Sequence, residues 1–370
     1  MSERKFILIS PKNRTVYNFR GDLIKEIIAK GYEVVVTGPD KTDVDKIEAL
    51  GARFVEIPMN KTGTSVVGDL KYCHALTKLL KTEKPDATLG YTVKPCVYGA
   101  IAAKRAKVKS INSLVTGGGY TFTATSFKAR VLGLIVRTLY RYGFSKADHV
   151  IFQNSDDLNE FTEKGLVNRE KCSFVNGSGV NMNQFELAPL PETITFFMLS
   201  RLLKSKGVQE YLEAAKQVKQ QHPKVRFCLL GKYEMAMQDA LDKEYVESFI
   251  RDGVIERFEE TSDVRPYYAM CSVYVLPSYR EGTPRTVLEA MAMGRPIITT
   301  DTQGCRETVK DDINGFLVPI KDSESVADKM DWFIENPERI TQMGSASRDY
   351  CAEKFDVNKV DADMIRIMKL

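Results

Sequence analysis

Histidine is scarce in this sequence, and so are the other patterns that build metal sites. The 370 residues include three histidines, at positions 74, 149 and 222, and none has the spacing of a metal ligand set. No Asp-x-Asp pair lies in a loop at the end of a strand segment, where a divalent cation would be held. The sequence therefore predicts a protein that needs no metal and no other cofactor.

Paired cysteines and long apolar runs are also missing. The seven cysteines are scattered and odd in number, with no Cys-x-x-Cys pair. This pattern argues against disulfides and zinc ribbons, and it predicts a reducing cytoplasm. No stretch approaches the ~20 apolar residues of a membrane helix. No Gly-x-Gly-x-x-Gly with an acidic residue further on is present, so a dinucleotide site is not expected.

Acidic residues are absent from one long stretch, between Asp86 and Asp148, which holds ten lysines and arginines. The imbalance extends to the two halves of the chain. Residues 1–185 carry 28 Lys+Arg and 18 Asp+Glu, a net +10, whereas residues 186–370 carry 25 and 31, a net −6. Opposite charges predict different partners for the two halves. Nucleic acid is not among them, because no aromatic platform or DNA-reading motif accompanies the basic residues.

Strand and helix patterns alternate along the whole chain. Strands such as 32–38 are separated by helices such as 18–30, and the second half repeats the pattern with a helix expected over most of 237–252. This alternation predicts α/β domains with parallel sheets. The segment from Asn176 to Thr193 is rich in Gly, Asn and Pro and is the candidate linker between domains 1–185 and 186–354. A ligand between two such domains is the natural expectation.

The segment Tyr279–Glu307 is predicted to begin with a ligand loop. A strand pattern ends just before this loop, and a helix pattern follows it within the segment. Thr283 is expected to cap that helix and Pro284 to be its first residue. The amides of Arg285 and Thr286 would then face an anion, and Glu281 and Glu289 would accept hydrogen bonds from sugar hydroxyls. These groups suit a nucleotide sugar. An ordinary capped helix with two exposed glutamates fits the same spacing.

A basic pair lies in the loop after the first strand of the second half. Arg201 provides a forked donor and Lys206 a point charge five residues later, which together suit a diphosphate. Taken alone, the pair also fits a solvated loop. Because both this loop and the one at 281–289 follow strand carboxyl ends in the same half, we expect them to converge.

The acid-free stretch contains a candidate membrane helix, Phe127–Lys146. Its cations include Lys128, Arg130, Arg137 and Arg141, and its apolar face comprises Val131, Leu134, Ile135, Leu139 and Tyr142. Such a helix can lie on an anionic membrane, where each cation contributes ~1 kcal/mol. A helix that turns its apolar face to the core and its basic face to solvent fits equally well.

With these residues in view, the chain resembles the retaining glycosyltransferases of GT-B fold known as family 4. The resemblance rests on the E-x7-E pair Glu281 and Glu289, on SRLLKSKG around Arg201 and Lys206, and on NGSGVNMNQF. It implies two Rossmann-like domains with parallel sheets facing a cleft, and a last helix at 355–370 that returns to the first domain. YNFR, PSYREGTP and GCRE resemble the bacterial α-1,3-N-acetylgalactosaminyltransferases that extend undecaprenyl-diphosphate-linked saccharides.

The resemblance also implies partners and roles. A UDP-sugar would be the donor and a polyprenyl-diphosphate-linked saccharide the acceptor, on the cytoplasmic face of the plasma membrane. Arg201 and Lys206 would stabilise the leaving UDP in place of a metal, Glu281 would meet the donor sugar, and Glu289 the ribose. The remaining donor contacts would be Gly231 and Phe258 near the base, and Gly282, Thr283, Pro284, Arg285 and Thr286 near sugar and phosphate.

Two loops of the first domain, expected near the donor phosphate and the sugar, depart from those of many relatives. The first loop, PKNRTVYNFR, has no glycine pair, and the loop Thr116–Phe122 has no histidine. Thr116 and Tyr120 are the candidates to replace that histidine, although the glycines between them also fit a simple hinge turn. The alternative functions are a UDP-N-acetylglucosamine 2-epimerase and a non-catalytic protein that binds carbohydrate or lipid head groups. The expected acceptor residues are Asn13, Arg14, Tyr17, Lys94, Thr116, Gly117, Gly118 and Tyr120.

Overall fold

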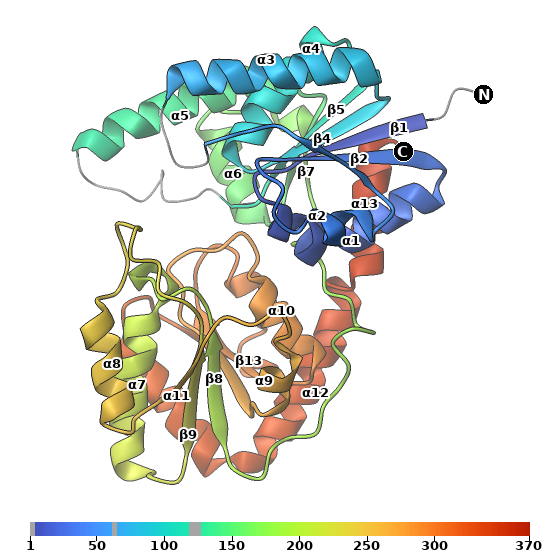
Figure 1. The fold of residues 1–370 in the computed structure, drawn as a ribbon. Coiled ribbons are helices and arrows are strands. Elements are labelled where there is room, and N and C mark those ends of the chain that lie inside the picture. Colours follow the sequence, from blue (N-terminus) through green and yellow to red (C-terminus); the bar gives the residue numbers. More distant parts are fainter. Residues whose placement is uncertain (1–3, 61–64, 118–126) are drawn as a thin grey trace. The chain divides into compact units, whose positions relative to one another are not determined.

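The computed structural model describes residues 4–60, 65–117 and 127–370, with side chains from 133 onward in the last range. The chain divides into two compact units (Figure 1). Unit 1 comprises residues 1–178 and 357–370, and unit 2 comprises residues 179–356.

Unit 1 is built on a parallel sheet of seven strands in the order β3-β2-β1-β4-β5-β6-β7. Its central strands are runs of β-branched and apolar residues that are buried on both faces, as expected for parallel strands covered by helices. In the register of the sheet, Ile9 at the carboxyl end of β1 lies opposite both Thr37 and Gly90. The strands are β1 Arg4–Ile9, β2 Tyr32–Gly38, β3 Arg53–Glu56, β4 Ala87–Tyr91, β5 Ser110–Val115, β6 His149–Phe152 and β7 Cys172–Phe174.

Alternate residues of β1 separate the core of unit 1 into two layers. Ile7 and Ile9 join the layer formed with α3, α4, α5 and α6, whereas Phe6 and Leu8 join the layer formed with α1, α2 and α13. A π-helical turn, η1, leads into α4. The helices are α1 Asn13–Ala29, α2 Val44–Glu48, α3 Val66–Glu83, η1 Pro95–Gly99, α4 Ala100–Arg105, α5 Phe127–Lys146, α6 Ser155–Glu163, η3 Arg169–Lys171 and α13 Val357–Met368.

Unit 2 has a parallel six-stranded sheet in the order β10-β9-β8-β11-β12-β13 around a single core. Its strands are β8 Thr195–Leu199, β9 Arg226–Leu230, β10 Glu256–Phe258, β11 Val273–Leu276, β12 Ile297–Thr300 and β13 Gly315–Val318. Its helices are η4 Lys204–Lys206, α7 Val208–Gln221, α8 Lys243–Arg251, α9 Arg265–Ala269, α10 Arg285–Ala292, η5 Arg306–Thr308, α11 Ser323–Glu335 and α12 Pro337–Lys354.

The strand orders define one switch point in each sheet, where the direction of winding reverses. In unit 1 it lies between β1 and β4, and in unit 2 between β8 and β11. In open α/β sheets, ligands bind outside the carboxyl ends of the strands at such a point, beside the loops that follow these strands.

Three expected boundaries differ from the structure. The first unit ends at Ser178 rather than at residue 185, because Val180 pairs with Asp356 and Phe185 packs in the core of unit 2. The helix expected from residue 18 begins at Asn13. The helix expected over most of 237–252 is confined to α8, because the preceding residues instead contact the loop after β8.

Candidate active site

The two loops at the switch point of unit 2 hold the three charged residues that were expected to act on the leaving UDP and the donor sugar. The loop after β8 carries Arg201 and Lys206, and the loop after β11 carries Glu281. Lys206 Nζ donates to Glu281 Oε1 at 2.5 Å, and both side chains are mostly buried. The convergence expected from the sequence is therefore present for Lys206 and Glu281. Arg201 is exposed, and its guanidinium makes no hydrogen bond or ion pair with any described residue.

Close backbone packing fixes the position of Glu281. Its amide donates to Gln303 O at 3.1 Å, and the Ser278 hydroxyl donates to Glu281 Oε1 at 2.8 Å. Gly304, at φ 76°, lies so close that an added Cβ would come within 2.3 Å of Glu281 O. Only glycine combines this backbone conformation with this approach. The carboxylate is thus held in place before any ligand binds.

Residues 239–240 support the loop that carries Arg201 and Lys206. Lys204 N donates to Asp239 O at 2.8 Å, and Ala240 forms an isolated bridge with Leu203. The Asp239 carboxylate also accepts from the Ser205 hydroxyl. The sequence did not indicate that Asp239 holds this loop. Its partner Ser205 lies 34 residues away in the sequence, so no local pattern links the two.

Glu289 is a buried carboxylate on α10, not the exposed glutamate of the alternative interpretation. It accepts from Arg285 Nε at 3.2 Å and from the Tyr268 hydroxyl at 3.0 Å. Burial raises the pKa of Glu289, and Arg285 partly opposes that effect. Arg285 Nη1 donates to Gly179 O at 2.6 Å, so this side chain is turned along its own helix and toward the start of unit 2. Tyr268 was not among the predicted residues.

The start of α10 differs from the prediction. Pro284 is the N-cap residue, with no side-chain cap, and the Thr283 hydroxyl donates to Gly282 O at 2.8 Å instead of accepting from the helix. Val287 N donates to Pro284 O at 3.0 Å, so the amides of Arg285 and Thr286 occupy the first turn, where helices leave amides without intrahelical acceptors. Pro284 has no amide to cap, which explains why a proline is tolerated here.

Gly231 and Phe258 meet at the carboxyl edge of the same sheet. Gly231 N donates to Phe258 O at 3.1 Å, and an added Cβ on Gly231 would come within 1.8 Å of Ser200 O. The glycine therefore lets the ends of β8, β9 and β10 approach one another. The edge of the Phe258 ring meets Tyr267, with ring centroids 5.0 Å apart.

The predicted acceptor residues of unit 1 fall into different environments. Asn13 is only 2% exposed and donates to Asp40 O and Thr42 O, so it holds the loop after β2 and is not available to an acceptor. The Tyr17 hydroxyl donates to Asp43 at 3.1 Å. Arg14, Thr116 and Gly117 are partly exposed near the carboxyl ends of β1 and β5. Gly118 and Tyr120 lie outside the described residues.

Lys94 lies in the loop after β4 and is paired with a residue that the sequence did not indicate. Its Nζ donates to Asp69 Oδ1 at 2.6 Å, and each side chain is 13% exposed. Asp69 belongs to the first turn of α3, 25 residues away in the sequence, so no local pattern links the two.

The helix α5 turns part of its apolar face to solvent. Leu134 is 62% exposed, Ile135 51% and Tyr142 52%, whereas Leu139 packs against the core. The alternative in which the whole apolar face of this helix packs on the core is therefore wrong. Arg137 Nε donates to Gly133 O of the same helix. The side chains of Lys128, Arg130 and Val131 lie outside the described part of the chain.

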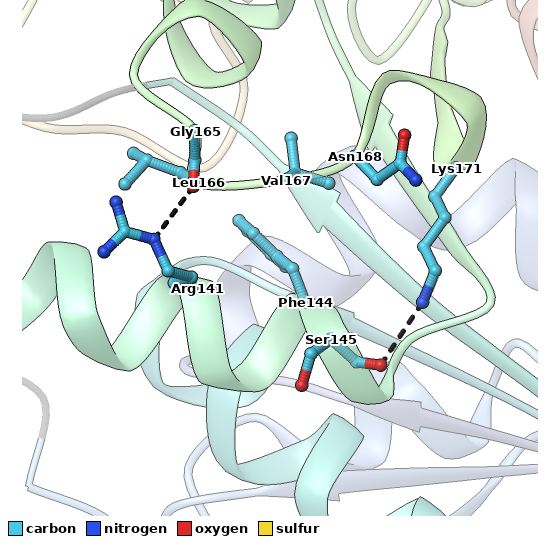
Figure 2. Close-up of a pocket in the computed structure, with 8 residues that line it drawn as sticks. All are labelled: Arg141, Phe144, Ser145, Gly165, Leu166, Val167, Asn168 and Lys171. Carbon is cyan, nitrogen blue, oxygen red and sulfur yellow. Dashed lines mark hydrogen bonds between the residues drawn. The ribbon is translucent and has the colours of Figure 1, made fainter.

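A pocket lies at the carboxyl-terminal end of α5 (Figure 2). Arg141 Nε donates to Gly165 O at 2.9 Å, Lys171 Nζ donates to Ser145 O at 3.2 Å, and Phe144 lies between the two cations. Both cations thus join α5 to the segment between α6 and β7.

Comparison with known proteins agrees with this arrangement. Residues 182–350 match the family described as Glycosyl transferases group 1, and residues 6–154 match that described as Glycosyl transferase 4-like. The chain belongs to the family 4 glycosyltransferases of GT-B fold. The expected fold class is confirmed, including the last helix, α13, which belongs to unit 1.

Two curated relatives are similar over most of their length. The chain is 27% identical to the N,N'-diacetylbacillosaminyl-diphospho-undecaprenol alpha-1,3-N-acetylgalactosaminyltransferase of Campylobacter jejuni, covering 95% of this glycosyltransferase and 94% of the relative. It is 27% identical to the UDP-Gal:alpha-D-GlcNAc-diphosphoundecaprenol alpha-1,3-galactosyltransferase of Escherichia coli, covering 73% and 71%. The crystal structure of Anabaena Alr3699/HepE in complex with UDP-glucose shares the fold, with a TM-score of 0.81, 18% identity and 99% of each chain covered.

Two kinds of feature are absent from the described residues of this glycosyltransferase. No group of three or more His, Cys, Asp or Glu side chains is arranged to hold a metal ion in the ranges 4–60, 65–117 and 127–370. Across those ranges, no helix has the length and apolar character that crossing a membrane requires.

Proposed function

We propose that this glycosyltransferase moves a sugar from a UDP-sugar to a polyprenyl-diphosphate-linked saccharide, with retention of anomeric configuration. N-acetylgalactosamine is the favoured sugar. The observation that carries the proposal is the Lys206–Glu281 pair at the switch point of unit 2, with Arg201 in the same loop. The names of the Campylobacter and Escherichia relatives support a lipid-linked acceptor, and the HepE complex supports a UDP-sugar donor.

In the proposed mechanism the cations of unit 2 stabilise charge that develops on the leaving diphosphate. Arg201 and Lys206 meet the phosphates, so no metal is required for this step, and Glu289 accepts from the ribose hydroxyls. The bond between the anomeric carbon and the phosphate oxygen breaks, and the acceptor oxygen bonds to the same face of that carbon. The acceptor proton passes to the released phosphate oxygen. Glu281 contacts the donor sugar and orients Lys206.

Substitution of the two cations tests the mechanism. Arg201→Ala and Lys206→Ala should each lower kcat by about 100- to 1,000-fold, because the charge they meet grows in the transition state. Lys204→Ala is the matched control, since Lys204 is exposed in the same loop, and it should retain nearly full activity. Near-normal turnover by Arg201→Ala, or consumption of UDP-sugar without any acceptor, would contradict the proposal.

The donor sugar is tested by ligand-induced stabilisation. UDP-N-acetylgalactosamine should raise the Tm more than UDP-galactose, UDP-glucose or UDP-N-acetylglucosamine at equal concentration, because a tighter ligand stabilises the folded state more. An equal or larger shift with one of the other nucleotide sugars would replace N-acetylgalactosamine in the proposal and leave the reaction class intact.

We also propose that α5 places the enzyme on the inner face of the plasma membrane. Leu134, Ile135 and Tyr142 are exposed on the helix that carries Arg141 and Lys146, a combination of apolar and basic side chains that suits an anionic membrane surface. Ile135→Asp and Arg141→Glu should each weaken sedimentation with anionic vesicles. Lys109→Glu, an exposed charge reversal in the same unit, is the control. Unchanged sedimentation of both α5 variants would refute this placement.

A further inference from the structure

A cluster of polar side chains lies at the switch point of unit 1. The proposed donor site in unit 2 does not include these side chains. Lys94 follows β4, Asp69 lies in the first turn of α3, and Tyr98 lies in η1. We propose that Asp69, Lys94 and Tyr98 bind the sugar of the acceptor, through its hydroxyl and amide groups, rather than the acceptor diphosphate. This inference rests on the proposed transfer to a lipid-linked saccharide.

The three side chains form one connected cluster. Lys94 Nζ lies 2.6 Å from Asp69 Oδ1, and the Tyr98 hydroxyl donates to Asp69 Oδ2 at 3.1 Å. Both carboxylate oxygens are therefore oriented by groups from η1 and the loop before it. Burial and the neighbouring Asp69 raise the pKa of Tyr98 to about 12, so its hydroxyl stays protonated and able to donate at neutral pH.

The loop that presents Lys94 is strained. Thr92 has φ 68°, a left-handed conformation that β-branched residues rarely adopt. An added Cβ on Gly90 would come within 2.5 Å of Pro95 O, so the chain turns back closely onto the end of β4. The turn continues into η1, a π-helical segment. Strained loop residues and π-helical turns concentrate at ligand sites, where they fix side chains in a required position.

Tyr72 packs beside the cluster. Tyr72, one turn after Asp69 on α3, is 3% exposed, and its hydroxyl has no hydrogen-bond partner among the described residues. Its ring meets the edge of Tyr98, with centroids 6.4 Å apart. This buried ring contact supports the Tyr98 side chain, and the inaccessible Tyr72 hydroxyl itself contacts no bound ligand.

Charge distinguishes a sugar from a diphosphate. The ammonium of Lys94 is paired with the carboxylate of Asp69, so the cluster is close to neutral. A diphosphate placed beside Lys94 would meet the Asp69 carboxylate at short range, and like charges repel. Sugar hydroxyls both donate and accept, and they match a carboxylate, an ammonium and a phenol together.

Kinetic constants test the assignment. Asp69→Asn, Lys94→Ala and Tyr98→Phe should each raise KM for the lipid-linked acceptor, by about tenfold for the first two, while KM for the UDP-sugar changes less than about twofold. Lys109→Ala is the matched control. It breaks the 2.8 Å ion pair between Lys109 and Asp86 of the same unit, which lies at the amino-terminal ends of the strands and not at their carboxyl ends. Tyr98→Phe keeps the ring and guards against loss of folding.

A binding measurement separates this inference from the proposed reaction. By titration calorimetry, a methyl N-acetylhexosaminide should bind the wild-type enzyme and bind Asp69→Asn much more weakly, whereas inorganic pyrophosphate should bind both equally. Loss of pyrophosphate binding alone would overturn the assignment to the sugar, as would an unchanged acceptor KM in all three variants. Glycoside binding by an enzyme that transfers no sugar would overturn the proposed reaction and retain the subsite.

Discussion

At the scale of single residues, the proposed donor site is held together by its own charges. Lys206 is paired with Glu281, and Arg285 with Glu289, with every one of these side chains no more than 21% exposed. These pairs keep the cations oriented when no phosphate is bound. In the proposed mechanism the diphosphate competes with the Glu281 carboxylate for Lys206. This competition lowers ground-state affinity and reserves the full interaction for the more highly charged transition state.

This competition predicts opposite effects of Glu281→Gln on binding and on turnover. Without the carboxylate, Lys206 is free to meet the diphosphate, so the affinity for UDP should rise by about threefold to tenfold. The kcat should fall by about 100-fold, because the orienting contact to Lys206 and the sugar is lost. Titration calorimetry with UDP and steady-state kinetics measure the two effects.

The control for this variant is Glu256→Gln. Glu256 pairs with Arg226 at 2.7 Å on an exposed part of unit 2, and its substitution should alter neither constant. A fall in UDP affinity together with kcat in Glu281→Gln would show that the carboxylate does not restrain Lys206.

At the scale of elements, helix starts show what local sequence can specify. The N-cap of α11 follows from its local sequence, because the Asp322 side chain accepts from Ser325 N, three residues further on, at 2.9 Å. For α10 the predicted N-cap residue was wrong. Thr283 and Pro284 both fit the local sequence pattern, and tertiary contacts place Pro284 at the N-cap. Likewise α8 begins only at Lys243, because the residues before it are held by the loop after β8.

Substitution of Asp322 by alanine should lower the free energy of unfolding by an amount that depends on pH. Hydrogen bonds from the Ser325 side chain and amide lower the pKa of Asp322 below 3.8. The carboxylate therefore stabilises the fold at pH values above 3.8, and that contribution disappears as the pH falls through the lowered pKa. Asp322→Ala should cost about 1 kcal/mol at pH 7.

Urea unfolding at several pH values measures the effect. The difference between wild type and Asp322→Ala should shrink toward pH 3, whereas Asp322→Asn, which keeps an N-cap acceptor, should remain within about 0.5 kcal/mol of wild type at pH 7. A cost that is independent of pH would assign the role of Asp322 to packing instead.

The site was predictable where chemistry follows strand ends, and not where it depends on distant partners. The approach of Lys206 to Glu281 could be predicted, because loops after neighbouring parallel strands converge. Asp69, Tyr268 and Asp239 could not, because their partners lie 18 to 34 residues away and depend on packing angles. Asn13 was misassigned, because a strand-end asparagine can equally hold a neighbouring loop.

At the scale of the whole molecule, unit 1 is completed by a helix from the far end of the chain. Val360, Met364, Ile365 and Met368 of α13 pack in the layer that contains α1, and the Ser110 hydroxyl of β5 donates to Met368 O at 2.9 Å. The stability of unit 1 therefore depends on residues that follow unit 2 in the sequence.

Truncation of Met364 should destabilise unit 1 selectively. Met364 is 2% exposed, so Met364→Ala should cost about 2–4 kcal/mol. The only tryptophan, Trp332, packs on Phe316 in unit 2 and reports unfolding of that unit. We expect faster hydrogen exchange in β1 and β5 with an unchanged Trp332 fluorescence transition.

The mirror variant is Met343→Ala, in the core of unit 2, where the side chain is 1% exposed. It should lower the midpoint of the Trp332 transition and leave exchange in unit 1 unaltered. If Met364→Ala shifted both readouts equally, the two units would unfold together rather than separately.

The late position of α13 also sets an order of assembly on the ribosome. Unit 2 is a continuous segment, so its core can close as soon as residue 356 has emerged, and domains generally fold as units during synthesis. Unit 1 is translated first, yet its α1 layer keeps an uncovered apolar surface until residues 357–370 arrive. The nascent enzyme therefore completes unit 2 before unit 1, the reverse of the order in which the two units begin in the sequence.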